Sequence, residues 1–202
     1  MKMKTTFKSF TDKHFTGKMS SGICSLAHRL KRDDSGMAAI EMAFIFPVMI
    51  TMLIGLVDVT DGLSANRKVT ITANTLGDLI SQEPGTTTKA NIDGIFAGAM
   101  QTMVPYDGSA LGLEIFNYRK DGDDAPQLNW EHRSGTNCGA APAISDDMSD
   151  LMTQSNDLII SRTCYNFSYI LGNLFHGNTS FPMVDEMTLR PRKSLQLDCT
   201  DC

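Results

Sequence analysis

A single apolar run near the N-terminus constrains this chain more than any other feature of its sequence. Of the 21 residues at positions 37–57, 17 are apolar, and Glu41 is the only charged residue among them. As a helix, this run spans about 31 Å at ~1.5 Å per residue, which matches the hydrocarbon thickness of a bilayer. A lone carboxylate in such a segment is energetically costly, which indicates that Glu41 has a function.

Charge is distributed unevenly on the two sides of the apolar run. Residues 1–36 hold eight Lys or Arg and three Asp, whereas the residues after position 36 hold ten basic and twenty acidic side chains. Basic residues beside one end of a membrane segment stay in the cytoplasm, so we predict that the N-terminus is inside and the C-terminal domain outside. The acidity of that domain argues against nucleic-acid binding, which needs a basic face.

The helical pattern continues beyond the apolar run. Apolar residues recur at spacings of four, three and four, which places them on one helix face: Val69, Ala73, Leu76 and Ile80. The pattern stops at Glu83-Pro84-Gly85, which breaks a helix. We therefore predict one long helix over 37–82, with its first half in lipid and its second half packed on a domain.

The remaining sequence predicts a second helix and four strands. Thr86, Thr87 and Thr88 offer an N-cap to a helix over 89–103, which ends before Pro105. Period-two and β-branched patterns predict strands at 111–117, 127–133, 157–171 and 186–192, with a turn at 121–124. Residues 134–156 and 172–185 are predicted as loops, the first with a short helix near 147–153.

These patterns predict an α+β chain in three parts: residues 1–36, a membrane helix at 37–58, and an outer domain at 59–202. In that domain a helix backs a small antiparallel sheet. Pro191 places the last strand at a sheet edge, because proline has no N–H for an inner ladder.

Four of the five cysteines lie beyond the apolar run: Cys138, Cys164, Cys199 and Cys202. An even number outside the membrane predicts disulfides, and three connectivities are possible. We favour Cys138 with Cys164 and Cys199 with Cys202. The spacing of Cys199 and Cys202 also suits redox or metal chemistry. That chemistry is disfavoured because the pair follows the last predicted strand and no helix starts at it.

The residues at the start of the apolar run resemble a known family. Arg-Asp-Asp-Ser-Gly-Met-Ala-Ala-Ile-Glu-Met-Ala at 32–43, followed by Phe46-Pro47, is similar to the N-terminal signature of TadE/TadG-like proteins. These are pseudopilins or minor pilins of the tight-adherence (Flp) pilus system. The segment 157–165 and the end Arg190-Pro191-Arg192 resemble the C-terminal part of that family.

The resemblance implies a pilin-like periplasmic domain anchored in a bacterial inner membrane. It also implies that a prepilin peptidase removes the leader, residues 1–36, by cutting between Gly36 and Met37. Glu41 would then be the fifth residue of the mature chain, one helical turn from the new α-amino group on Met37 and close enough to pair with it within one chain. In related pilin systems this carboxylate pairs with the amine of a neighbouring subunit, which offsets the desolvation of both charges. The implied partners are the peptidase, other Tad pilus proteins and pilins, and membrane lipid.

Two other interpretations of the apolar run remain. An unprocessed single-pass anchor would carry a periplasmic binding or interaction module, with Glu41 reaching the membrane interface. A secretory signal peptide cut after Ser64 is disfavoured by the long basic segment and by Asp58 and Asp61 just before that position.

The sequence contains no arrangement typical of an active site. His132 and His176 are the only histidines after residue 36, and serine-hydrolase, zinc-protease and phosphate-loop motifs are missing. Asp121, Asp123 and Asp124 resemble part of a calcium loop without its closing Glu, which favours a hairpin turn. We predict no enzyme activity, cofactor, metal site or small-molecule substrate.

Overall fold

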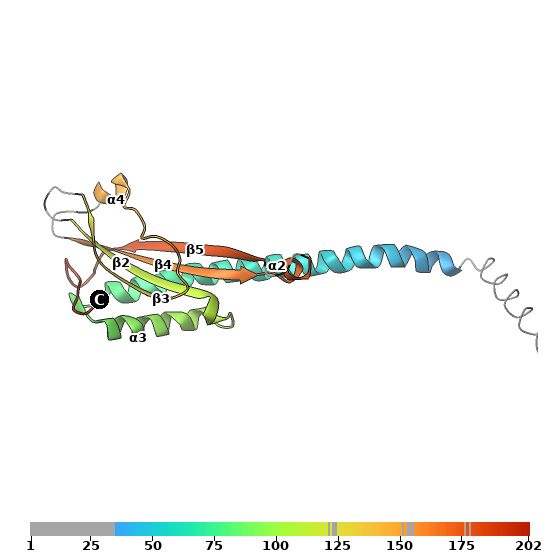
Figure 1. The fold of residues 1–202 in the computed structure, drawn as a ribbon, viewed down its shortest axis with the longest axis horizontal. Coiled ribbons are helices and arrows are strands. Elements are labelled where there is room, and N and C mark those ends of the chain that lie inside the picture. The colour runs from blue at the N-terminus through green and yellow to red at the C-terminus, as the bar shows by residue number, and fades with distance from the viewer. Residues whose placement is uncertain are drawn as a thin grey trace, which may run out of the picture. The chain divides into compact units, whose positions relative to one another are not determined.

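The computed structural model describes residues 35–120, 122, 125–150, 152, 156–175, 177 and 179–202. Most of the predicted leader and Cys24 lie outside these residues, as do Asp121, Asp123, Asp124 and His176. The chain divides into two compact units, Met1–Met52 and Leu53–Cys202. Figure 1 shows the ribbon with its helices and strands labelled.

Helix α2 runs over Ser35–Ser81, and its 47 residues confirm the long helix predicted over 37–82. Within the first unit, every side chain from Gly36 to Met52 is exposed. The helix is long and apolar enough to cross a membrane, and none of its most apolar stretch is buried inside the protein. A helix that is apolar on all sides and not covered by protein is typical of a membrane span.

The second unit has its main core between the C-terminal half of α2, helix α3 (Lys89–Met100) and one face of a sheet. The predicted α2 stripe is confirmed, because Val69, Leu76 and Ile80 are fully buried and Ala73 is 2% exposed. Helix α3 adds three buried apolar side chains: Ile92, Phe96 and Ala99.

Helix α3 begins as predicted and ends earlier. Thr88 is its N-cap, and the Thr88 hydroxyl accepts a hydrogen bond from the Asn91 amide. The predicted helix over 89–103 is an α-helix to Met100 and then a tighter 3₁₀ turn, η1, over Gln101–Met103. Pro105 follows two residues later and has no N–H to continue the helix.

Four antiparallel strands form the sheet, which confirms the predicted number and orientation. They are β2 (Leu111–Arg119), β3 (Gln127–Gly135), β4 (Asp157–Ser168) and β5 (Ser180–Leu189). Their order is β3-β2-β4-β5, so β2 and β4 are central and β3 and β5 are edges. In Figure 1 α2 and α3 lie along the same side of this sheet.

Two of the four strands differ clearly from their predicted bounds. The strand predicted over 157–171 ends at Ser168, and Ile170–Phe175 form the short helix α5. The strand predicted over 186–192 is β5, which already starts at Ser180 inside the predicted loop and ends at Leu189. Pro182 fits there because β5 is an edge strand and Pro182 needs no inner ladder partner.

The second face of the sheet is also buried, beneath the loop that follows β3. Phe116, Tyr118, Leu158 and Ile160 form a smaller core with Met152, and Ala141, Ile144 and Met148 pack against it. The loop contains the short helix α4, Asp146–Asp150, where a helix near 147–153 was predicted; residue 153 lies outside the described residues. This cover explains why β2 is buried on both faces although its sequence alternates.

A pair of short strands, which the sequence did not predict, ties the C-terminal segment to the start of α3. Strand β1 (Thr86–Thr87) pairs in parallel with β6 (Asp198–Cys199). The Thr200 amide also donates a hydrogen bond to the Thr87 carbonyl oxygen at 3.2 Å. The two residues of each strand are too few to show a period-two pattern.

Candidate functional site

The described part of the N-terminal motif lies at the start of α2, where every residue from Gly36 to Ala43 is exposed. Gly36 and Met37 occupy the first turn, and a side chain placed on Gly36 would meet nothing within 4 Å. Glu41 follows Met37 by four residues, which puts the two on the same helix face. A protease that cuts an extended backbone would therefore have to unwind only the first turn of α2.

The surface around Glu41 is apolar on every side of the helix. Met37 is 64% exposed, Phe44 75% and Met52 72%. Burying such side chains in lipid stabilises a helix, and a carboxylate there needs a partner. The apolar run itself offers Glu41 no such partner, since no cation lies at positions 37–57.

Asp58 and Asp61 follow the apolar run, and both bind other segments of the second unit to this part of α2. The Asp58 carboxylate accepts hydrogen bonds from the amides of Ile170 and Leu171, at 3.0 and 2.9 Å. Asp61 accepts one from the hydroxyl of Tyr106 at 2.8 Å. Burial and then this contact raise the pKa of Tyr106 to about 12. From the sequence, both Asp residues served only to disfavour a signal-peptide cut after Ser64.

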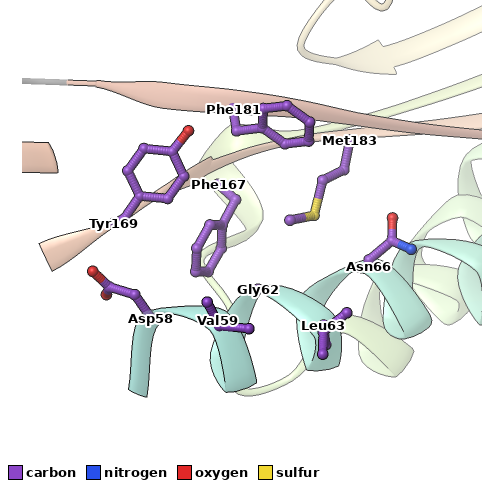
Figure 2. Close-up of a pocket in the computed structure, with 9 residues that line it drawn as sticks. All are labelled: Asp58, Val59, Gly62, Leu63, Asn66, Phe167, Tyr169, Phe181 and Met183. Carbon is purple, nitrogen blue, oxygen red and sulfur yellow. The ribbon is translucent and has the colours of Figure 1, made fainter. Parts of the chain in front are cut away.

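An apolar groove of about 410 Å³ lies between α2 and the ends of β4 and β5 (Figure 2). It is lined by Asp58, Val59, Gly62, Leu63, Asn66, Phe167, Tyr169, Phe181 and Met183. The lining is mostly apolar, and the Asp58 carboxylate is occupied by backbone amides. This lining suits an apolar segment better than a reacting substrate, because catalysis needs polar groups that are free to act.

Cys138 and Cys164 form a disulfide with a Cα–Cα distance of 5.6 Å. It joins the loop after β3 to the central strand β4. Gly112 lies beside it on β2, where a Cβ atom would come within 2.7 Å of both sulfur atoms. Only glycine fits at this position, which sequence reasoning did not single out.

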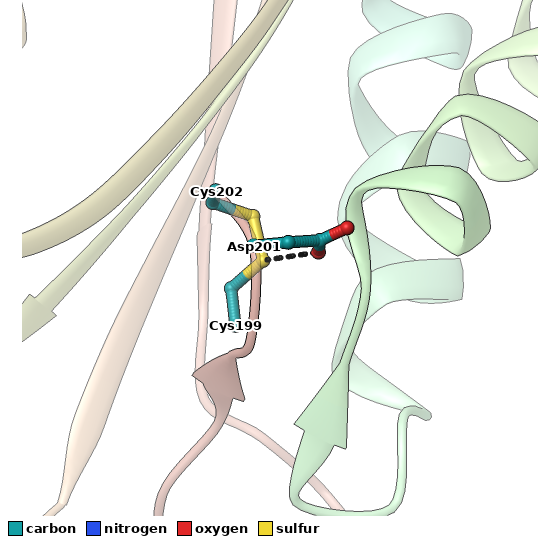
Figure 3. Close-up of side chains that lie close together, drawn as sticks. All are labelled: Cys199, Asp201 and Cys202. Atoms are coloured by element: carbon teal, nitrogen blue, oxygen red, sulfur yellow. Dashed lines mark hydrogen bonds between the residues drawn. A yellow bond between two sulfur atoms is a disulfide. The ribbon is translucent and has the colours of Figure 1, made fainter.

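Cys199 and Cys202 form the second disulfide, so both favoured pairs are present. Cys199, Asp201 and Cys202 lie close enough together to suggest a metal site (Figure 3). The two sulfur atoms are bonded to each other, however, and a disulfide offers no thiolate to a metal. Asp201 instead accepts a hydrogen bond from the Lys89 amide at 2.6 Å, which fixes this segment to the start of α3.

Two buried carboxylates support the sheet and were not predicted. Asp157 is bound by Arg119 at 2.7 Å and accepts a hydrogen bond from the Leu197 amide at 2.8 Å. Glu114 is fully buried, and its oxygen atoms lie 3.5 Å from Arg133 and 3.5 Å from Arg162. Each carboxylate is paired and hydrogen-bonded, which is the arrangement that a structural buried charge requires.

His132 is held in a structural setting. Its ring stacks on Phe96 with centroids 5.4 Å apart, and its Nε2 atom lies 2.8 Å from the Asp93 carboxylate. This contact joins β3 to α3 at the surface of the core. His132 does not line the apolar groove.

Comparison with known proteins identifies the N-terminal segment. The family model described as TadE-like protein matches residues 36–75. No curated protein and no solved structure matches the chain. The matched segment begins at Gly36, contains Glu41 and the exposed apolar surface, and ends inside the buried stripe of α2. Residues 36–75 are thus similar to TadE-like protein, and the family resemblance of the N-terminal motif is confirmed.

Proposed function

We propose that this chain is a minor pilin or pseudopilin that assists biogenesis of a tight-adherence (Flp) pilus. The observation that carries the proposal is the match to the TadE-like family over the exposed apolar helix that holds Gly36 and Glu41. Such proteins generally have structural rather than enzymatic roles. The buried ion pairs and the engaged Asp58 carboxylate fit a structural role as well.

The proposed maturation is a cut by a prepilin peptidase between Gly36 and Met37. The cut would create an α-amino group on Met37, one helical turn from Glu41. Within one chain, or between neighbouring chains, this cation would offset the cost of the carboxylate in lipid. Because the pair would join specific residues, it would also set the axial register of one subunit on the next.

The proposed location is the bacterial inner membrane, with the N-terminus in the cytoplasm and the second unit in the periplasm. Two observations support this orientation. The segment before α2 is basic, and basic segments stay in the cytoplasm. The second unit contains two disulfides, which persist in an oxidising compartment such as the periplasm. Its proposed partners are the peptidase, other Tad assembly proteins and pilins.

Replacement of Glu41 by Gln tests the assembly role. The variant keeps the size of the side chain and loses its charge, so membrane insertion should persist while piliation falls. Glu83→Gln is the matched control, because Glu83 lies beyond α2. The Gln side chain keeps an oxygen that can accept the hydrogen bond from the Asn91 side chain. Piliation is measured by electron microscopy of cells in which each variant replaces the wild type. Normal piliation with Glu41→Gln would contradict the role.

The second candidate is an unprocessed membrane-anchored module that binds an apolar partner in the periplasm. The groove between Leu63 and Phe181 favours it, because an apolar surface of this kind marks an interaction site. This candidate predicts an uncut chain and normal piliation when the gene is deleted. Deletion that abolishes piliation, with recovery on re-expression, would exclude it in favour of the pilus role.

A further inference from the structure

The short helix α5 carries an unusually exposed apolar face. Four of its six residues are large and apolar, at spacings that place them on one side of a helix: Ile170, Leu171, Leu174 and Phe175. Ile170 is 56% exposed, Leu174 66% and Phe175 64%. Exposure of three large apolar side chains to water is unfavourable, unless lipid or another surface covers them.

The structure fixes α5 to one particular turn of α2. A Cβ atom on Gly55 would lie 3.3 Å from the Leu171 side chain, so the two helices are in close contact there. One turn later, the Asp58 carboxylate accepts the amide hydrogens of Ile170 and Leu171. In Figure 1 α5 is the short orange-red coil that lies against α2 beyond the end of β4.

This turn of α2 is where the predicted membrane span ends. Gly55 lies inside the predicted span over 37–58, and Asp58 is its last residue. Both belong to the same compact unit as α5. The nearby α2 side chains are also exposed and apolar, with Leu56 at 68% and Val57 at 50%. The exposed face of α5 is therefore continuous with the surface that lipid would cover.

We propose that Ile170, Leu174 and Phe175, the α5 foot, insert into the lipid at the periplasmic membrane interface. Leu and Phe are the side chains that short interfacial helices bury at the boundary between headgroups and acyl chains. Asp58 fits at this depth because both of its oxygen atoms accept backbone amides, which replace the water that it loses. The inference rests on α2 crossing the membrane and not on processing at Gly36.

The foot gives the anchored domain a second point of attachment. A single helix lets the domain rotate and tilt about its exit point from the membrane, whereas a second insertion beside Gly55 restricts both motions. The groove between α2 and β5 would then open just above the membrane surface, since Asp58 lines one end of it and caps α5.

Depth-dependent fluorescence quenching tests the foot. The full chain carries Cys24→Ser, which removes the cysteine outside the two disulfides. One new cysteine is introduced at a time and labelled with the fluorophore NBD, without reductant so that the disulfides stay intact. Leu174→Cys reports on the foot and Phe46→Cys on the membrane span. Gln127→Cys is the control. Gln127 pairs with Arg119, the last residue of β2. At ~3.3 Å per residue, this end of β2 is about 26 Å from the end of β2 that is near α5.

Each protein is reconstituted into phosphatidylcholine vesicles that contain no nitroxide, lipids with a nitroxide near the headgroup, or lipids with a nitroxide deep in the acyl chain. We expect the label at Leu174 to be quenched at least about twofold more than the label at Gln127, because only the foot lies at the interface. Quenching at Phe46 by the acyl-chain nitroxide, with none at Leu174 by the headgroup nitroxide, would overturn the foot alone. Quenching at neither position would overturn the membrane span and the foot together.

A protein partner on the same face would give a different result. If α5 is covered by a second copy of the chain, the Leu174 label would shift to the blue at high protein-to-lipid ratio without responding to nitroxide lipid, and the proposal would be wrong. Leu174 is largely exposed, so Leu174→Cys should leave the fold intact. The buried Trp130 provides the check, because its emission reports on the core.

Discussion

The hydroxyl of Ser161 donates a hydrogen bond to the main-chain oxygen of Ala73 at 2.9 Å, and so joins the central strand β4 directly to the backbone of α2. Such a contact requires an unusually close approach between a helix and a sheet. Gly77 permits it, because a Cβ atom there would lie 2.6 Å from the Ser161 hydroxyl and 2.3 Å from the Leu189 side chain. The sheet of the second unit is thus packed directly on the C-terminal half of α2.

Gly77→Ala should destabilise the domain by about 1 kcal/mol or more. Overpacking of a core typically costs ~1–3 kcal/mol, and the better helix propensity of Ala returns up to ~1 kcal/mol. Urea unfolding of the detergent-solubilised chain, followed by the fluorescence of Trp130, measures the change. Gly94→Ala is the matched control, since a Cβ atom on that exposed α3 residue meets nothing within 4 Å; it should raise stability by ~0.5–1 kcal/mol. Equal effects at both glycines would show that α2 does not approach the sheet this closely.

Removal of the Cys138–Cys164 disulfide should lower the free energy of unfolding by about 3 kcal/mol, because the bridge closes a long loop in the unfolded chain. The sequence separation of these cysteines is 26, against 3 for Cys199 and Cys202. The double variant Cys138→Ser/Cys164→Ser is therefore compared with Cys199→Ser/Cys202→Ser in the same urea titration. The second pair should have the smaller effect, and the reverse order would contradict the loop-closure argument.

The hydroxyl of Tyr106 should keep its proton well above the pH at which an ordinary tyrosine loses it. Burial and the hydrogen bond to Asp61 raise the pKa of Tyr106 to about 12 from its ordinary value of 10.0. Because the folded pKa is above the unfolded one, the stability linked to this proton is fully present below pH 10 and is lost as the pH rises through 12. The difference in tyrosinate absorbance between wild type and Tyr106→Phe should have its midpoint near pH 12, with circular dichroism confirming the fold. A midpoint near 10 would rule out the contact with Asp61.

The helical part of the fold could be predicted from the sequence because its signals are long and local. The stripe that ends at Ile80 repeats over several turns, and Thr88 marks the start of α3. Both helices therefore agree with their predicted starts to within two residues.

The errors arise where a distant residue decides the local structure. Tyr169 and Ile170 have high strand propensity, which led to a predicted strand that continues to Leu171. The Asp58 carboxylate, more than a hundred positions earlier, takes the amides of two of these residues and starts α5. Glu114 likewise sits at a position where an alternating strand predicts exposure. It is fully buried because the loop after β3 covers that face and two arginines pair with it.

The candidate site was predictable only as a motif. Gly36, Met37 and Glu41 could be found because a single glycine and a single carboxylate stand out in an apolar run. The α5 foot could not be found in this way, since its position beside Gly55 depends on how β4 ends in space.

The mass of the N-terminal peptide of the mature protein tests the central proposal most directly. The full chain is expressed with and without a cognate prepilin peptidase, together with Gly36→Val and the control Gly94→Val, which places the same side chain in open space on α3. The account predicts that wild type and Gly94→Val begin at Met37 only when the peptidase is present, and that Gly36→Val stays uncut. A wild-type chain that keeps all 202 residues beside an active peptidase would contradict it.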